Sequence, residues 1–391
     1  MADSSHKAPA SSSSAFHSAP TEKRPDYVPP SDATGDLKNG PKDDKPRGFF
    51  GKLKAWAKRH HTALWFLHSF YALALGVMVM LFAAKGFAHA RVLAATLGAA
   101  FLVMVILFRF FGHGKEQKEK VAQKASLKLR FLGMTYVLKN LYQGMLFFVL
   151  PFYWKSSSLD SINAWFVIML ATFALLSTMD LVFDHVLMRY KAVAAVFYGI
   201  TLFACCNLII PAFFDNVPTL VALLVSAVLA TFGFWLLHFP IRGLREKRTW
   251  GIIGMVMLGV VAAVYFARVT IPPVPLYVVH QGVGMQQMTD GQLKLEVVRV
   301  HKSLVTDLYA LSEVALPGGE GDTFEHIWRR PDGTRVTVEA RTRDGGAKGQ
   351  IRLVSNFPKA DMPENPTGEW RVDTMTAAGQ IVGRTRFMVI E

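Results

Sequence analysis

Four polar residues inside long apolar segments are the side chains whose types and spacing could do chemistry in this chain. Lys139, Asn140 and Gln143 lie within about one helical turn of each other, and Asp180 lies near the end of the next apolar segment. Polar and ionisable groups inside membrane spans are costly and usually face the interior of a helix bundle or water. The four residues are therefore candidate ligand-binding residues for a proton or an anionic ligand. The alternative is structural, an ion pair or a lysine that extends toward the cytoplasmic surface, and the sequence favours it.

Arginines near the C-terminus form the second group of interest. Arg329, Arg330 and Arg335 flank a predicted turn and give it a basic face. Such a face is usually only a solvated surface, but it could meet an anionic envelope polymer or lipid. His326 is a conceivable base, yet it alternates with apolar neighbours as a packed side chain does. No nucleophile pattern or metal-ligand spacing is complete, so the sequence predicts no catalytic residue, metal or cofactor and favours a protein that is not an enzyme.

Long apolar segments must position these groups. Apolar residues make up 51% of the 391 residues and charged residues only 18%. A membrane-spanning helix needs about 20 apolar residues, and a helix satisfies its own backbone in lipid. The sequence predicts seven spans, at residues 62–84, 92–111, 131–153, 162–183, 193–214, 218–239 and 251–270.

Basic residues crowd every second gap between these segments. The gaps on the side of the N-terminus hold 18 Lys and Arg, whereas the gaps on the opposite side hold three, Lys85, Arg91 and Lys155. Because Lys and Arg favour the cytoplasmic side, the N-terminus is predicted to be cytoplasmic. Seven crossings then place the C-terminal domain outside the cytoplasm, which is the periplasm in a Gram-negative bacterium, and the protein in the inner membrane.

The N-terminal region precedes the first span. Residues 1–44 are rich in Ser, Pro and charge, which predicts a disordered cytoplasmic tail. Residues 45–61 combine Lys and Arg with four large apolar side chains, which favours an amphipathic juxtamembrane segment on the inner leaflet. The net charge of +14 is explained mainly by residues beside the spans, so nucleic acid is not expected as a partner.

The period of the apolar residues changes after the last span. Prolines in residues 271–287 predict a stiff linker between the bundle of residues 62–270 and a domain of residues 288–391. Alternating apolar and polar residues predict strands at 293–297, 324–328, 335–342, 351–353, 369–376 and 381–390. The predicted fold is therefore a seven-helix membrane bundle followed by a small antiparallel β-sandwich-like domain.

Several short runs in the C-terminal domain resemble a known bacterial family. His326-Ile-Trp328, Pro331-Asp-Gly333, Gly368-Glu-Trp370-Arg-Val-Asp373, Gly379 and Phe387-Met-Val389 resemble the family named domain of unknown function 2914. The order and composition of the membrane region are similar to the accompanying family, domain of unknown function 5924. The resemblance implies a bacterial envelope protein with a β-sandwich-like outer domain, and neither family brings an established activity or site.

Two functions from different classes remain open on these grounds. The favoured one is a non-enzymatic membrane protein that displays its β domain as a binding or envelope-assembly module, with the lipid bilayer and a periplasmic protein or envelope polymer as partners. The alternative is a transporter or ligand-sensing bundle that uses the polar residues of the third and fourth spans. The ligand, the process and the oligomeric state have no signal in the sequence.

Overall fold

The computed structural model describes residues 61–84, 125–179, 191–214, 216–238, 246–286, 293–317, 321–343 and 349–391, with six single helical residues between 92 and 106. The predicted tail of residues 1–44 and nearly all of the predicted juxtamembrane segment 45–61 lie outside these residues. Residues 60–391 form one compact unit.

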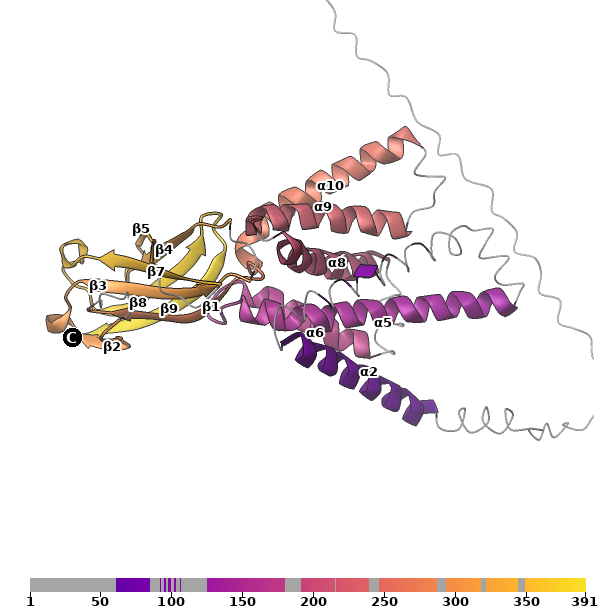
Figure 1. Cartoon of the computed structure of the whole chain (residues 1–391), viewed down its shortest axis with the longest axis horizontal. Coiled ribbons are helices and arrows are strands. Elements are labelled where there is room, and N and C mark those ends of the chain that lie inside the picture. The colour runs from indigo at the N-terminus through magenta and orange to yellow at the C-terminus, as the bar shows by residue number, and fades with distance from the viewer. Residues whose placement is uncertain are drawn as a thin grey trace, which may run out of the picture. The chain divides into compact units, whose positions relative to one another are not determined.

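Six long helices make up the apolar half of this unit (Figure 1). Their sequences are apolar on all sides, as expected of helices that face lipid or other helices rather than water. The helices are α2 (His61–Ala84), α5 (Ala125–Lys155), α6 (Ala164–Thr178), α8 (Lys191–Phe213), α9 (Thr219–His238) and α10 (Lys247–Ala267).

Three of these helices are long and apolar enough to cross a membrane, which indicates membrane association. The qualifying stretches are Ala195–Phe213, Thr219–Leu236 and Lys247–Thr270. The predicted count of seven spans is not supported by the described residues. The apolar helix of α6 has only 15 residues, and most of the segment predicted at 92–111 lies outside the described part of the chain.

Polar side chains in the spans bind neighbouring helices. Gln143 of α5 donates from Nε2 to the Ala72 carbonyl of α2 at 2.8 Å. Asn207 of α8 donates from Nδ2 to the Tyr153 hydroxyl of α5 at 3.1 Å, and that hydroxyl lies 3.2 Å from the Ala204 carbonyl. Hydrogen bonds of this kind hold helices together where the surroundings offer no water.

The other half of the unit is a sandwich of two sheets. The four-stranded sheet has the order β1-β3-β7-β6, and the five-stranded sheet has the order β2-β9-β8-β4-β5. Neighbouring strands are antiparallel except β2 and β9, which are parallel. The strands are β1 (Tyr277–Gly284), β2 (Arg299–His301), β3 (Leu308–Ala315), β4 (Phe324–Arg329), β5 (Arg335–Glu339), β6 (Arg341–Arg343), β7 (Gln350–Phe357), β8 (Gly368–Thr376) and β9 (Ile381–Ile390).

Four aromatic side chains fill the centre of the sandwich. Trp328 and Trp370 are fully buried, and Phe357 and Phe387 are almost fully buried. The ring centroids lie 5.2 Å apart for Trp328 and Phe357, and 5.9 Å apart for Trp370 and Phe387. Because large aromatic side chains bury much apolar area, this cluster stabilises the domain without disulfides, as the sequence predicted for a domain lacking cysteine.

The predicted linker of residues 271–287 is wrong in its extent. Residues 271–276 are buried, with Ile271 and Val274 in the core of the helices and Leu276 in a core of the sandwich. β1 then begins at Tyr277 and pairs with β3, so the β domain starts before residue 288. Burial on both sides makes this segment a shared part of the two cores rather than a spacer.

Two predicted strands also differ from the structure. Residues 293–297 form only an isolated bridge from Glu296 to Gly284, and the exposed Leu295 does not enter the core. The predicted strand 335–342 is divided, because the chain changes sheets at the buried Ala340. The hairpin of β8 and β9 and the strand β4 agree with the prediction.

Candidate functional site

The polar group predicted in the third and fourth spans is only partly described. Gln143 is buried and bonded to α2, and Asn140 is half-buried. Asp180 and the side chain of Lys139 lie outside the described part of the chain. Convergence of the four side chains on one site therefore stays a prediction.

The three predicted surface arginines have different surroundings. Arg329 donates from Nε to Oδ2 of Asp373 at 2.8 Å. Arg330 donates to the Asp361 carbonyl at 2.7 Å, and its guanidinium lies 5.7 Å from the centroid of the Phe357 ring. Arg335 is exposed on β5. Only part of the predicted basic face is therefore free to bind a partner.

Polar residues gather instead where the β domain meets the ends of the helices. Asp322, just before β4, accepts a hydrogen bond at Oδ2 from the backbone N–H of Thr219 at 3.0 Å. Thr219 is the first residue of α9, so Asp322 satisfies one of the free N–H groups of that helix end. A carboxylate there also interacts favourably with the helix dipole. Burial nevertheless raises the pKa of Asp322, while its hydrogen bonds with Thr219 act in the opposite direction.

A second contact joins the start of α6 to the start of β9. Asn163 precedes α6 and is fully buried. Its Nδ2 donates to the Ile381 carbonyl at 2.9 Å, while its Oδ1 accepts from the Ser158 N–H at 3.2 Å and from the Ser161 hydroxyl. One side chain thus closes the α5–α6 connection and attaches it to the β domain.

The turn between β8 and β9 makes the third contact. Arg268, directly after α10, donates from Nε to the Ala378 carbonyl at 2.8 Å. Gln380 accepts from the Thr219 hydroxyl at 2.9 Å and donates to the Ile271 carbonyl at 3.4 Å. Gln380 is fully buried, so these bonds are shielded from water.

Charged groups extend this interface along β9. Asp373 is fully buried and receives Arg329 and Arg384, with Arg384 Nη2 at 3.0 Å from Oδ2. The hydrogen bond to Asp373 raises the pKa of Arg384. Arg384 also donates to the Asp160 carbonyl at 2.6 Å, and Arg386 lies 3.2 Å from the Asp160 carboxylate. The α5–α6 connection is therefore tied to the five-stranded sheet.

His326 lies inside the sandwich and is not an accessible base. Its Nδ1 lies 2.7 Å from the Ser355 hydroxyl and its Nε2 lies 3.1 Å from the Ser312 hydroxyl, which bridges the two sheets. The side chain is fully buried, and burial lowers the pKa of His326 to about 4. The imidazole is therefore neutral at physiological pH and serves the packing of the domain, as the alternation of residues predicted.

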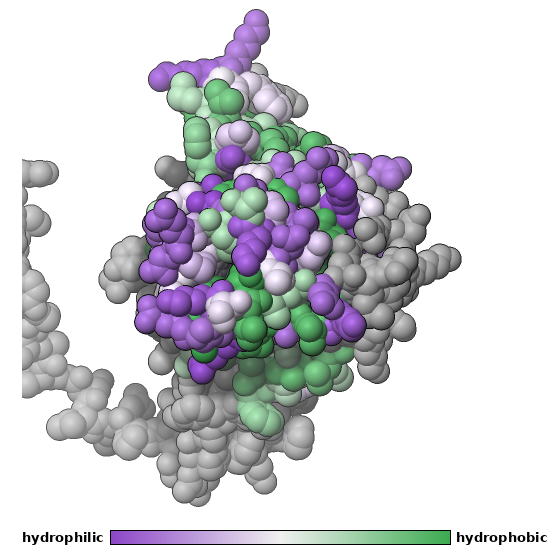
Figure 2. All heavy atoms as spheres, turned by 90° about the vertical axis from the view of Figure 1, so that its left-hand side faces the viewer, coloured by the Kyte–Doolittle hydropathy of each residue, from purple (hydrophilic) through white to green (hydrophobic). Residues whose placement is uncertain are grey.

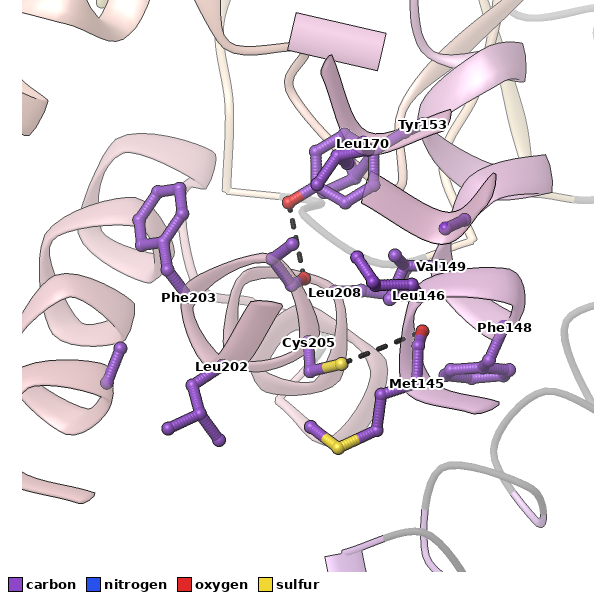
Figure 3. Close-up of a cluster of buried hydrophobic side chains, with 14 of the residues drawn as sticks. Met145, Leu146, Phe148, Val149, Tyr153, Leu170, Leu202, Phe203, Cys205 and Leu208 are labelled. Carbon is purple, nitrogen blue, oxygen red and sulfur yellow. Dashed lines mark hydrogen bonds between the residues drawn. The ribbon is translucent and has the colours of Figure 1, made fainter. Parts of the chain in front are cut away.

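A cavity of about 120 Å³ lies among α5, α8 and α9. Met145, Phe148, Leu202 and Cys205 line it, and Figure 3 shows these side chains together, with the Cys205 thiol 3.9 Å from the Met145 carbonyl. The lining suits an apolar group rather than an ion. Among the described residues, no three His, Cys, Asp or Glu side chains are placed to hold a metal ion.

The residues of the interface had little signal in the sequence. Asn163 and Thr219 are types that favour helix starts, and Thr219 follows a proline. Those signals predict helix ends but not a partner 218 residues away in the chain, as for Asn163 and Ile381. Asp322 and Gln380 stand in no motif, so only the fold brings them to the helices.

Comparison with known proteins places the chain in a family. A search of curated proteins finds no match. The match to a family model ends within β3, so the resemblance of the later strands to domain of unknown function 2914 stays a prediction. The match covers residues 48–309, which include the described helices as well as β1 and β2. Because it spans more than half of the chain, this protein belongs to the Family of unknown function (DUF5924).

Proposed function

We propose that this protein is a multi-pass protein of the bacterial inner membrane that holds its β domain rigidly on the periplasmic side as a non-enzymatic binding or assembly module. The observation that carries the proposal is the set of polar contacts between the β domain and the ends of α6, α9 and α10. These contacts fix both where the domain sits on the helices and how it is presented.

The identity of those helix ends supports the periplasmic orientation. The β domain contacts the α5–α6 connection, the α8–α9 connection and the segment after α10 through Asp160, Thr219 and Arg268. The first two connections, residues 156–163 and 214–218, contain no Lys or Arg. The gaps at the other ends of the helices, at 115–130, 189–191 and 242–248, are rich in them. The bias of Lys and Arg toward the cytoplasm supports this orientation whatever the number of spans.

A binding role accords with the chemistry of the described groups. His326 is enclosed by the sandwich, and Asp373 is neutralised by two arginines. Both groups are used to build the domain, whereas the outer face of the five-stranded sheet retains exposed arginines. In the helices, the Gln143 amide is bonded to α2, which supports a packing role for this residue rather than transport.

Cysteine labelling tests the orientation. In a background with Cys205→Ala and Cys206→Ala, Thr337→Cys would place a thiol on exposed β5, and Glu246→Cys would place one before α10. A membrane-impermeant maleimide should label the first variant in spheroplasts and the second only after lysis. The reverse pattern would refute the periplasmic position of the β domain.

A cross-linking measurement tests the rigid attachment. Asn163 and Ile381 meet across the interface, so a Ser161→Cys and Val382→Cys pair should form a disulfide in the same background on mild oxidation. A matched pair, Ser161→Cys and Thr337→Cys, joins positions in different parts of the β domain and should not cross-link. Equal cross-linking of both pairs would show a loosely tethered domain and would contradict the proposal.

A further inference from the structure

Four arginines stand side by side across the outer face of the five-stranded sheet. The register pairs Arg386 of β9 with Arg371 of β8, Arg371 with Arg329 of β4, and Arg329 with Arg335 of β5. Directly paired residues of antiparallel strands share a face of the sheet. With strands about 4.8 Å apart, this arginine row is about 14 Å long.

The negative groups around the arginine row do not balance it. Glu369 accepts from Arg371 at 2.9 Å and lies 3.2 Å from Arg386, and the hydrogen bond from Arg371 lowers the pKa of Glu369. Asp373 is shared between Arg329 and Arg384. Arg335 is exposed, and within the described residues it has no ion-pair or hydrogen-bond partner. The row keeps an excess of positive charge toward β5.

Such an arrangement is unfavourable for the fold alone. Like charges directly opposite each other on neighbouring strands destabilise a sheet. Here the same type recurs on four successive strands, and three of its members are well exposed, with Arg371 and Arg386 at 41% and 37% side-chain exposure and Arg335 on the surface. Hydrophilic side chains cover much of the β-domain end seen in Figure 2. An external anion would relieve the repulsion along the row.

The shape of the row points to a thin, charged occupant. It is one residue wide, since the next cross-strand positions hold Asp373 and Thr337 on one side and Glu369 on the other. A folded protein partner needs a broader patch with an apolar centre. The planar guanidinium group binds carboxylate and phosphate through two parallel hydrogen bonds, and four of them in line match negative groups repeated along a chain.

We propose that the arginine row binds a linear anionic polymer of the cell envelope, with carboxylate or phosphate groups spaced along its backbone. This inference rests on the proposed function, because it names the class of partner that the periplasmic β domain would take. The polymer lies across the strands and contacts Arg335, Arg329 and Arg371 in turn.

Binding of defined polymers to the full-length protein in nanodiscs tests this site. A fluorophore on Thr337→Cys, in the background without Cys205 and Cys206, reports binding beside Arg335, because Thr337 lies on the same face two residues along β5. The probes are polygalacturonate for carboxylate and polyphosphate for phosphate, with neutral dextran as the reference polymer. Both anionic polymers should bind, more weakly as salt rises, and dextran should not.

Substitutions in the row provide the decisive comparison. Arg335→Gln should weaken binding of the anionic polymers about tenfold, as expected for loss of a charge-assisted hydrogen bond, and the additional change Arg371→Gln should weaken it further. The matched control, Arg341→Gln with Lys359→Gln, removes two exposed charges away from the row and should bind as the unchanged protein does. Arg335→Gln alone leaves every described ion pair intact, so its result does not depend on folding.

Three outcomes would overturn the proposal. The first is equal affinity of the row variants and the unchanged protein, and the second is an equal loss in the control variant. The third is stronger binding of an acidic peptide than of either polymer through the same arginines, which would identify a protein as the partner. Each of these leaves the labelling result for the orientation untouched, so failure of the row and failure of the proposed function are distinguishable.

Discussion

Replacing Asp322 by alanine should release the first turn of α9 from the β domain. The carboxylate accepts the Thr219 N–H at 3.0 Å, and Thr219 is only 2% exposed, so water does not readily replace the lost acceptor. Leaving a buried donor unsatisfied costs about 1–3 kcal/mol, and losing a helix cap costs a similar amount by the same physical route. We therefore expect the interface to open with a free energy lower by about 1–3 kcal/mol.

Hydrogen exchange followed by mass spectrometry measures this opening in the full-length protein in nanodiscs. A change of about 1–3 kcal/mol makes exchange about 5- to 150-fold faster where the interface protects the amides. The effect should appear in peptides that contain Thr219 and in those that contain Gln380, which contacts Thr219. Peptides from the middle of α9 and from β4 serve as internal references and should not change.

Asp322→Asn is the matched control. An asparagine retains an oxygen that can accept the Thr219 N–H, and burial already disfavours the charge of Asp322 by raising its pKa. This variant should therefore exchange within a few-fold of the unchanged protein. Unchanged exchange in the Asp322→Ala variant would refute the stabilising contact, and equal acceleration in β4 would show global unfolding instead.

Three further predictions concern buried positions. Burial lowers the pKa of His326 to about 4, below the value near 6.5 of an unfolded chain, so stability present above pH 6.5 should be lost as the pH falls to 4, by up to about 3 kcal/mol; thermal denaturation should show this loss and His326→Gln should lack it. Gly76→Leu should lower thermal stability by about 1–3 kcal/mol, because its Cβ would lie 2.5 Å from the Phe147 ring, whereas Gly254→Leu, with open space around it, should not. Gln143→Leu should cost about 0.6 kcal/mol by removing the bond to α2, and a gain in stability on denaturation in detergent would contradict that role.

The sequence predicts well those elements that have a local pattern. The predicted span 218–239 corresponds to α9 at Thr219–His238, and the predicted strands 369–376 and 381–390 correspond to β8 and β9. In each case the segment carries its own apolar period and is bounded by turn residues. The helix–sheet choice is then fixed by length and period before any long-range contact forms.

Elements that depend on long-range pairing were missed. β1 has a Gly-containing sequence with little alternation, yet it is a strand because β3 pairs along its length from Tyr277 to Gly284. Leu293 and Leu295 alternate correctly but lie beside β1, where Leu295 is 51% exposed and forms no regular ladder. Tertiary pairing outweighs local pattern at both places.

The candidate site was out of reach for the same reason. The arginines of the row lie on four strands, and their alignment depends on the register of three separate strand pairs. A shift of one residue in any pair would move one arginine to the opposite face. The sequence shows that arginines are abundant there, but only the register shows that four of them form a line.

The connection between α10 and β1 decides how the two halves of the protein influence each other. The prolines after α10 predicted a stiff spacer, which would let the β domain move as a unit above the membrane. Instead, Ile271 and Val274 pack with the helices and Leu276 packs in the sandwich, while Arg268 and Gln380 join the same segment to the β8–β9 turn. A displacement of α10 must therefore carry the start of β1 with it, because packed cores do not deform continuously. The same coupling runs in reverse, so a polymer bound at the arginine row, which reaches Asp160 through Arg386, would bear directly on the ends of the helices.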